Sequence, residues 1–323
     1  MEGNAINPSK GSLDDNMLIV SSSPHLRSDR TTKKIMLDVI IALVPAMIGA
    51  VYFFGMNALK LILISVAASV IAEFAIQKLF KKEVSIDDFS AVITGILIAF
   101  NLPANAPWWI PVAAAIFGIV VVKQFFGGIG QNFMNPALAA RAFLVASWPG
   151  IMAEYVLPGA DAITGATPLA ILESGKIARL PSMMDMFVGN IGGSIGETSA
   201  LLLLIGGLYL IIRKVINWKT PVVYIATTAI MLFVLGVETS ELAYHLLSGG
   251  LILGAFFMIT DYSSTPVTPW GQIIVGVGAG ILTAVIRIKG GFPEGVSYSI
   301  LLMNVVTPLI EKFTGPRTFG RSK

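Results

Sequence analysis

The stretch IMLDVIIALVPAMIGAVYFFG, residues 35–55, carries one charged side chain, Asp38, among 21 residues. A helix needs about 20 apolar residues to cross the hydrocarbon core of a bilayer, so this stretch is typical of a transmembrane helix. The whole chain follows the same trend, because 55% of its 323 residues are hydrophobic and 13% are charged. Soluble domains carry about 25% charged residues. The composition therefore indicates an integral membrane protein.

Further apolar runs of this kind follow along the chain, and such runs predict membrane helices. The third and fifth runs are short and end at Pro103 and Pro149. Short or interrupted helices at matching places in two halves are typical of a binding site at membrane depth. The predicted fold class is an all-α integral membrane protein with about ten transmembrane helices. We expect them at about 35–55, 57–80, 89–103, 107–126, 135–149, 197–217, 220–237, 241–260, 269–288 and 297–313.

The two halves of the chain resemble each other. Pro107-Trp108, an apolar run and Gly127-Gly128 return as Pro269-Trp270, an apolar run and Gly290-Gly291, 162 and 163 residues later. This spacing predicts two five-helix repeats. An odd number of helices in each repeat makes the second one run inverted in the membrane. The expected organisation is an N-terminal segment (1–34), a first repeat (35–149), a loop (150–196), a second repeat (197–313) and a tail (314–323).

The placement of lysine and arginine predicts the orientation, because cytoplasmic loops are enriched in both. The termini and the loops on their side of the membrane hold 16 of them. The opposite side holds five, which are Lys60, Lys176, Arg179, Arg287 and Lys289. We therefore expect both termini in the cytoplasm and residues 150–196 on the outer face. The first 34 residues lack the basic-then-apolar layout of a cleavable signal peptide.

Missing residue types exclude several kinds of site. The chain has no cysteine, which excludes disulfides, thiolate catalysis and cysteine-ligated iron–sulfur clusters or haem within it. His25 and His245 are the only histidines, which excludes a histidine-rich metal site. We expect membrane lipid and no nucleic acid among the partners.

The polar interval between the two helical blocks contains Asp161-Ala162-Ile163-Thr164-Gly165-Ala166-Thr167-Pro168-Leu169. A glycine between small hydroxyl residues is usually a turn, so an ordinary exposed loop is one interpretation. The string Asp-x-x-Thr-Gly-Ala-Thr is also similar to the acceptor motif on which a flavin transferase esterifies FMN, through its phosphate, to the last threonine. In that interpretation, Gly165 and Ala166 permit the close backbone approach that the transferase needs.

Further strings occur in a fixed order along the chain. They are Ser23-Pro24-His25, Gly127 to Ala137, Gly192 to Ser199, Phe256 to Asp261, Gly291 to Val296 and Leu301 to Asn304. Together with the Thr167 motif they resemble the family of D subunits of the Rnf electron-transport complex. They also resemble the homologous B subunits of the Na⁺-pumping NADH:quinone reductase. The chain lacks the long N-terminal extension expected of the quinone-reductase subunit, which favours Rnf.

The resemblance implies an FMN bound covalently to Thr167. Asp161 would hold the substrate metal or activate the hydroxyl during transfer, and Thr164, Gly165 and Ala166 complete the motif. The implied complex passes electrons between ferredoxin and NAD⁺ in a bacterial or archaeal plasma membrane and couples them to Na⁺ or H⁺ movement; the sequence leaves the ion open. The implied partners are the flavoprotein G subunit, the membrane A and E subunits, the NAD-binding C subunit, the Fe–S B subunit and a flavin transferase.

Two alternatives remain open at this stage. One is the B-type subunit of the quinone reductase, in which a quinone is the final acceptor. The other is a passive channel or solute transporter, because inverted five-helix repeats with short helices also build pores.

Other residues are candidates for cofactor contacts. The resemblance implies a second, non-covalent flavin such as riboflavin near the cytoplasmic side in some relatives, and Asn132 and Asn135 carry amides that can hydrogen-bond an isoalloxazine ring. Helix capping before Pro136 is the alternative for both. Three residues at the expected start of the sixth helix, Gly192, Gly193 and Ser194, offer backbone N–H groups to an anionic ligand. The alternative is that this segment caps the helix.

Charged side chains within membrane helices are costly and usually functional. Asp38 and Glu73 lie near expected helix ends, where they can reach the interface, and Lys123 is a further candidate. Arg141 lies deeper, where it either neutralises a flavin group or pairs with a carboxylate. Asp261 lies where the eighth helix breaks and is a candidate for a Na⁺ path, with an interface charge as the alternative.

Overall fold

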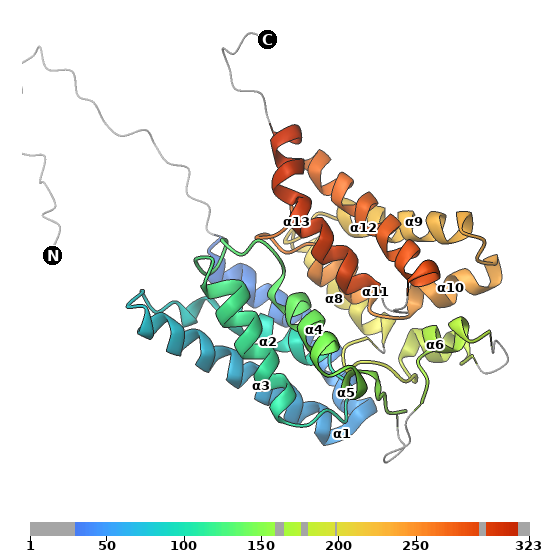
Figure 1. The fold of residues 1–323 in the computed structure, drawn as a ribbon, viewed down its shortest axis with the longest axis horizontal. Coiled ribbons are helices and arrows are strands. Elements are labelled where there is room, and N and C mark those ends of the chain that lie inside the picture. The colour runs from blue at the N-terminus through green and yellow to red at the C-terminus, as the bar shows by residue number, and fades with distance from the viewer. Residues whose placement is uncertain (1–29, 159–164, 176–179, 198, 291–294, 316–323) are drawn as a thin grey trace, which may run out of the picture. The chain divides into compact units, whose positions relative to one another are not determined.

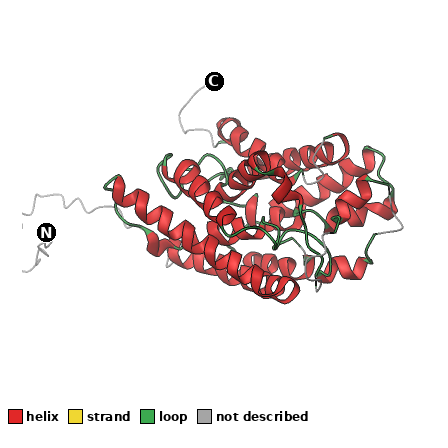
Figure 2. Cartoon of the chain, turned by 60° about the horizontal axis from the view of Figure 1, so that its bottom comes forward, coloured by secondary structure: helices red, strands yellow, loops and turns green. Residues whose placement is uncertain are grey.

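The computed structural model describes residues 30–158, 165–175, 180–197, 199–290 and 295–315. The chain divides into two units, residues 1–31 and 32–323, and the helices of the described residues lie in the second. Asp161 and Thr164 lie outside the described residues. In the described part, the elements are helices joined by loops, without a strand (Figure 2). The prediction of an all-α protein is therefore confirmed for the described residues.

The first and longest element, α1 (Thr32–Leu79), has a break in its middle. Gly55 has φ 66° and ψ −155°, a backbone conformation outside the helical region. This combination is reached almost only by glycine, since a Cβ would be strained there. The break divides α1 into the two helices that the sequence predicts at 35–55 and 57–80.

The other predicted helices are also present, with shorter bounds in several cases. In the first half they are α2 (Ser90–Phe100), α3 (Trp109–Ile116) with the π-helix η2 (Phe117–Gln124), and α4 (Pro136–Ser147). In the second half they are α8 (Ala200–Ile212), α9 (Lys219–Val234), α10 (Thr239–Leu247), α11 (Leu251–Leu253) with the π-helix η4 (Gly254–Met258), α12 (Pro269–Lys289) and α13 (Val296–Thr314). Short helices that the sequence did not indicate are η1 (Ile86–Asp88), α5 (Pro149–Ala153), α6 (Pro168–Glu173) and α7 (Met183–Val188).

Length and apolar composition identify the elements able to cross a membrane by themselves. Among the described residues, three helices meet both criteria: α1, α12 and α13. A fourth crossing results if α10 and the segment Leu251–Met258 are taken together; they meet at a bend of 62°. This bend replaces the continuous eighth helix predicted at 241–260. Gly249 and Gly250 form it, with φ 64° and 67°.

The two halves pack against each other through helices far apart in the sequence. α8 contacts α1, and α13 contacts α4, while α12 packs between α9 and α13 (Figure 1). Close approach depends on small residues. A Cβ on Gly206 of α8 would lie 2.1 Å from the carbonyl oxygen of Ala42. Glycine contacts of this kind allow backbones to approach closely in membrane proteins, where packing drives helix association.

Candidate functional site

Thr167 is buried and occupies the N-cap of a short helix. Its side chain is 8% exposed, and its hydroxyl accepts a hydrogen bond from the N–H of Ala170 at 3.3 Å. Pro168 follows at the first helical position, which is the usual arrangement at a helix start. The interpretation of this segment as an ordinary exposed loop is therefore wrong at Thr167 itself.

Thr167 faces a cavity of about 290 Å³, which we call the Thr167 cavity. Apolar side chains from α4 and α5 form much of its wall, and the polar groups are Arg141, Tyr155, Ser297 and Tyr298. Gly165 and Ala166 line the same cavity and also a second one of about 510 Å³ on the far side of the motif. Gly165 and Ala166 therefore border both spaces, whereas Thr167 borders only the first of these two.

Arg141 of α4 reaches the end of α2 and the segment before α8. Its guanidinium donates to Glu197 Oε1 at 2.9 Å and to Asn101 Oδ1 at 2.9 Å, with a longer contact of 3.4 Å to Ser194 Oγ. Arg141 is 5% exposed, and its ion pair with Glu197 is buried. Of the two roles predicted for Arg141, the structure shows the carboxylate pair and also places Arg141 in the wall of the Thr167 cavity.

The segment Gly192 to Ser194 is not at a helix N-terminus. α8 begins at Ala200, and its N-cap is Ser199, whose hydroxyl accepts from the N–H of Leu202 at 3.3 Å. The predicted anion site on the dipole of this helix is therefore wrong, because the glycines lie more than one turn before the helix. Instead, Ser194 pairs as a β-bridge with Pro103, and Gly192 and Gly193 line a small space that Thr167 also borders.

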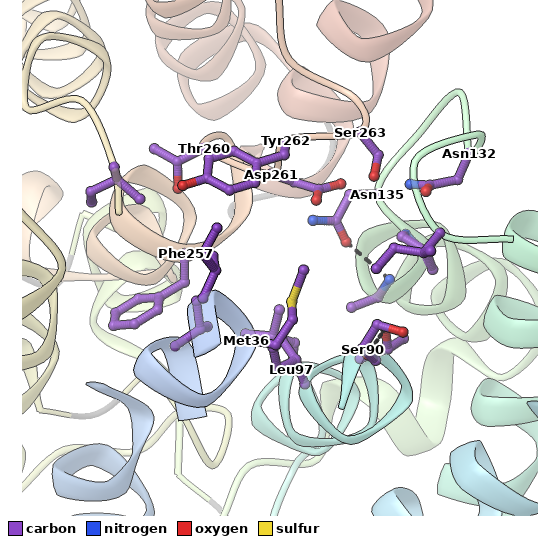
Figure 3. Close-up of a pocket in the computed structure, with 18 of the residues that line it drawn as sticks. Met36, Ser90, Leu97, Asn132, Asn135, Phe257, Thr260, Asp261, Tyr262 and Ser263 are labelled. Carbon is purple, nitrogen blue, oxygen red and sulfur yellow. Dashed lines mark hydrogen bonds between the residues drawn. The ribbon is translucent and has the colours of Figure 1, made fainter. Parts of the chain in front are cut away.

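Another cavity, of about 110 Å³, lies between the N-terminal part of α1, α2, the start of α4 and the end of η4. We call it the Asp261 cavity (Figure 3). Its polar end carries Asp261, Asn132 and Asn135, and the aliphatic and aromatic side chains Met36, Leu97 and Phe257 surround the rest (Figure 3). The predicted pair Asn132 and Asn135 and the separately predicted Asp261 thus meet in one place.

Asn135 performs two tasks. Its side-chain oxygen accepts from the N–H groups of Ala137 and Leu138, which caps α4 as the alternative prediction stated. Its side-chain nitrogen donates to the carbonyl of Met258 at 3.3 Å, and its backbone N–H donates to Asn304 Oδ1 at 3.1 Å. These bonds fix the start of α4 against η4 and α13.

Asp261 lies between the Asp261 cavity and a further cavity of about 290 Å³ lined by Asn217 and Gln272. Its carboxylate accepts from the Ser264 hydroxyl at 3.0 Å. Burial raises the pKa of the Asp261 carboxyl, while hydrogen bonds and the charge of Lys123 oppose part of that rise. Within the described residues, no three metal-ligating side chains of the His, Cys, Asp and Glu types lie together.

A buried ion pair lies beside the Asp261 cavity. Lys123 Nζ is 2.8 Å from Glu73 Oε2, and their side chains are 3% and 1% exposed. Lys123 also donates to the Ser90 hydroxyl at 2.6 Å, and Gln124 donates to Glu73 at 2.7 Å. The prediction that Glu73 reaches the interface is wrong, because its helix packs against η2. Asp38 does lie near a helix end, bonded to Tyr209 and Arg213.

Sequence reasoning did not identify four residues as structural partners: the buried Asn101, Arg287 and Asn304, and the partly buried Tyr155. Arg287 stands inside an apolar run, which is a signal that the sequence contains, but it was counted as a loop charge. The other three are ordinary polar residues, and only the packing of distant helices shows their partners.

Comparison with known proteins bears on the same residues. Residues 19–320 match the NQR2, RnfD, RnfE family. The chain belongs to this family. Both cavities lie within the part of the chain that this family spans.

Individual members of the family match along nearly their whole length. The D subunit of a Na⁺-translocating ferredoxin:NAD⁺ oxidoreductase complex from Acetobacterium woodii is 56% identical, over 95% of this chain and 96% of the relative. The D subunit of a proton-translocating ferredoxin:NAD⁺ oxidoreductase complex from Clostridium ljungdahlii is 45% identical, over 95% and 98%. The D subunit of an ion-translocating oxidoreductase complex from Stutzerimonas stutzeri is 36% identical, over 90% and 92%.

Proposed function

We propose that this chain is the D subunit of an Rnf-type ferredoxin:NAD⁺ oxidoreductase and carries electrons on an FMN esterified to Thr167. The observation that carries the proposal is the end-to-end similarity to the D subunits of such complexes, which covers the Thr167 motif and both cavities. The flavin supplies the redox chemistry, and the protein binds and orients it. The quinone-reductase subunit is less well supported, because these relatives are subunits of ferredoxin:NAD⁺ enzymes.

The described residues around Thr167 fit a flavin phosphoester. A motif of small residues leaves room beside the hydroxyl. Cavities of about 290 and 510 Å³ adjoin this motif. The larger is within the usual range of about 300–1,000 Å³ for ligand pockets, and the smaller is close to it. Arg141 brings a positive charge to the cavity wall, which suits an anionic ester. These groups would hold the cofactor after a flavin transferase has attached it.

Attachment can be tested by in-gel fluorescence of the denatured subunit after expression with a flavin transferase. Thr167→Val should give a dark band, but it also removes the N-cap of α6, which typically costs about 1 kcal/mol. Thr167→Asn is therefore the sharper variant, because its side chain can keep the cap without offering a hydroxyl. Persistent fluorescence with Thr167→Asn would overturn the attachment site. A passive channel would be dark in every variant, the wild type included.

The ten helical segments support ten membrane crossings in two inverted five-helix repeats, with both termini in the cytoplasm. Lys123 and Arg287 are buried, so neither belongs in a count of loop charges. The Lys and Arg bias without them is still 15 to four. In the proposed topology, the Thr167 cavity opens toward the outer face, where the flavoprotein G subunit would meet it. The A, B, C and E subunits complete the proposed complex.

The topology can be tested by labelling a single cysteine, because the chain has none. Ser174 is exposed and has nearly the size of cysteine, whereas the neighbouring Gly175 has φ 68° and disfavours a side chain. Ser174→Cys should react with an impermeant maleimide added to intact cells. Reaction only after lysis would reverse the proposed orientation.

The Asp261 cavity is the proposed place for the second, non-covalent flavin and for ion coupling. Asn132 and Asn135 present amide groups there, and Asp261 presents a carboxylate next to hydroxyl groups. The two most similar relatives named above differ in their ion, Na⁺ in one and H⁺ in the other. The proposal therefore leaves the ion open and assigns Asp261 to its path.

A further inference from the structure

Arg287 of α12 has no role in the function proposed so far, although it is 7% exposed in a helix able to cross the membrane. Within the described residues, no carboxylate lies at salt-bridge distance from it, and its Nε has no hydrogen-bond partner. An isolated buried guanidinium is costly unless its surroundings stabilise it. The surroundings of Arg287 must therefore stabilise its charge.

The guanidinium of Arg287 closes the break between α10 and α11. It donates to the carbonyls of His245, Ser248 and Gly249, with distances of 3.1 and 3.4 Å for the last two. These carbonyls lie at the C-terminal end of α10, where a helix carries partial negative charge. Arg287 therefore fixes the turn formed by Ser248, Gly249 and Gly250.

That turn is the surface on which the Thr167 segment and Glu197 pack. A Cβ on Gly249 would lie 2.2 Å from Cδ1 of Leu169, which follows Thr167 by two residues. A Cβ on Gly250 would lie 2.7 Å from Glu197 Oε1. Thr167, Glu197, Ser248 and Gly249 border one small space. The position of the turn thus decides the position of both the acceptor segment and the buried carboxylate.

The charges in this region do not balance. Glu197 pairs directly with Arg141 at 2.9 Å and packs against the turn whose carbonyls accept from Arg287. Two positive groups share one negative group. Among the described residues, the interior beside Thr167 therefore carries one excess positive charge, held by backbone carbonyls instead of by a second carboxylate. In a medium of low dielectric constant, such a charge acts over longer distances than it would in water.

We propose that Arg287 is a positioning residue that seats the Thr167 segment and supplies the excess positive charge which raises the reduction potential of the group on Thr167. This inference rests on the proposed flavin attachment. An electron that arrives at that group adds one negative charge unless a proton follows. The excess positive charge stabilises the reduced form relative to the oxidised form, which corresponds to a higher potential.

The test is a spectroelectrochemical titration of the purified complex. The titration signal of the group on Thr167 is obtained by subtracting the signal of complexes that carry Thr167→Asn from the signal of complexes that carry Thr167. Arg287→Gln should lower the midpoint potential of this group, because the excess charge disappears. Glu197→Gln should raise it, because one negative charge is removed. Arg287→Lys keeps the charge and should stay closer to the wild type than Arg287→Gln does.

The matched control is Arg213→Gln, which removes an arginine that is 56% exposed, at the opposite end of α8 from Glu197. It should leave the potential unchanged. If each substitution only loosened the structure, the midpoint potentials of Arg287→Gln and Glu197→Gln would shift in the same direction. That result would overturn the inference. If Arg287→Gln does not fold, Glu197→Gln still decides, because a lowered or unchanged potential contradicts the proposal. Loss of in-gel fluorescence in the wild type would instead contradict the flavin attachment itself.

Discussion

The Thr167 cavity and the Asp261 cavity each lie beside a buried ion pair, Arg141–Glu197 at the first and Lys123–Glu73 at the second. Each region also has one further charged residue besides the ion pair, and the sign of that charge differs between the two regions. Arg287 adds a positive charge at the turn beside the Thr167 segment, and Asp261 adds a carboxylate at the other cavity. One region is therefore suited to an anionic group and the other to a cation, although both are lined mainly by apolar side chains.

The same pair of regions shows a correspondence between the two proposed repeats. Arg141 of α4 donates to the carbonyl oxygen of Asn101, just after α2, at 3.4 Å. Asn304 of α13 donates to the carbonyl oxygen of Ser264 at 3.1 Å. Both residues of the second contact lie 163 residues after those of the first, which equals one of the two sequence offsets. The contact supports the proposed repeat, and the exchange of arginine for asparagine distinguishes the two sites.

The largest expected effect comes from breaking one ion pair. Glu73→Ala leaves Lys123 charged and buried, which should cost about 3–5 kcal/mol of folding free energy. The measurement is thermal unfolding of the detergent-solubilised protein. The control Glu83→Ala removes an exposed carboxylate four residues beyond α1 and should change little. An equal, small effect of both variants would show that the pair does not stabilise this cavity.

A smaller effect is expected at the contact that corresponds to Arg141 and Asn101. Asn304→Leu leaves the N–H of Asn135 without its side-chain acceptor and removes one donor to Ser264. Unsatisfied buried groups cost about 1–3 kcal/mol, so a measurable loss of thermal stability should follow. Flavin fluorescence at Thr167 should persist, because Asn304 bonds to Asn135, which lines the other cavity. Leu302→Ala, on an exposed face of the same helix, is the control for lost side-chain volume. A dark band in Asn304→Leu would mean that the two regions are not independent.

Asp261 should affect ion dependence more than stability. Asp261→Asn keeps size and removes charge, so ferredoxin-driven NAD⁺ reduction in proteoliposomes should slow or lose its dependence on Na⁺ or H⁺. Because burial raises the pKa of Asp261, its carboxylate is neutralised at a higher pH than that of an exposed aspartate. As the pH falls through this raised pKa, the wild type should approach the behaviour of the variant. Asp87→Asn, an exposed change, is the control. Unchanged ion dependence in Asp261→Asn would assign Asp261 to the interface charges.

The smallest effect is expected at the pair of Asp38 and Arg213, which lies at 3.3 Å with Arg213 56% exposed. Pairs of this kind contribute about 0–1 kcal/mol. Arg213→Gln should therefore lower the thermal stability by at most that amount, and about 0.5 M salt should abolish the difference. A loss comparable to that of Glu73→Ala would mean that exposure is a poor guide to the strength of the ion pairs in this protein.

The sequence alone indicated the long helices and a membrane protein, but it did not indicate the short helices η1, α5, α6 and α7. Long apolar runs permit few alternatives, because unpaired backbone groups in lipid are costly. It also indicated Thr167, Asn132, Asn135 and Asp261, since each stands next to a helix end or within a recognisable motif. Local patterns of this kind involve neighbouring residues, so they can be read along the chain.

Which charges meet depends on how distant helices pack. Glu197 follows Arg141 by 56 residues and Lys123 follows Glu73 by 50, and no spacing rule connects them. The start of α8 at Ala200 and the bend at Gly249 and Gly250 depend in the same way on contacts with distant helices. The energy of a buried charge depends on its partner and on the exclusion of water, and both arise only when helices pack. The sign of the charge beside each cavity is therefore a property of the fold.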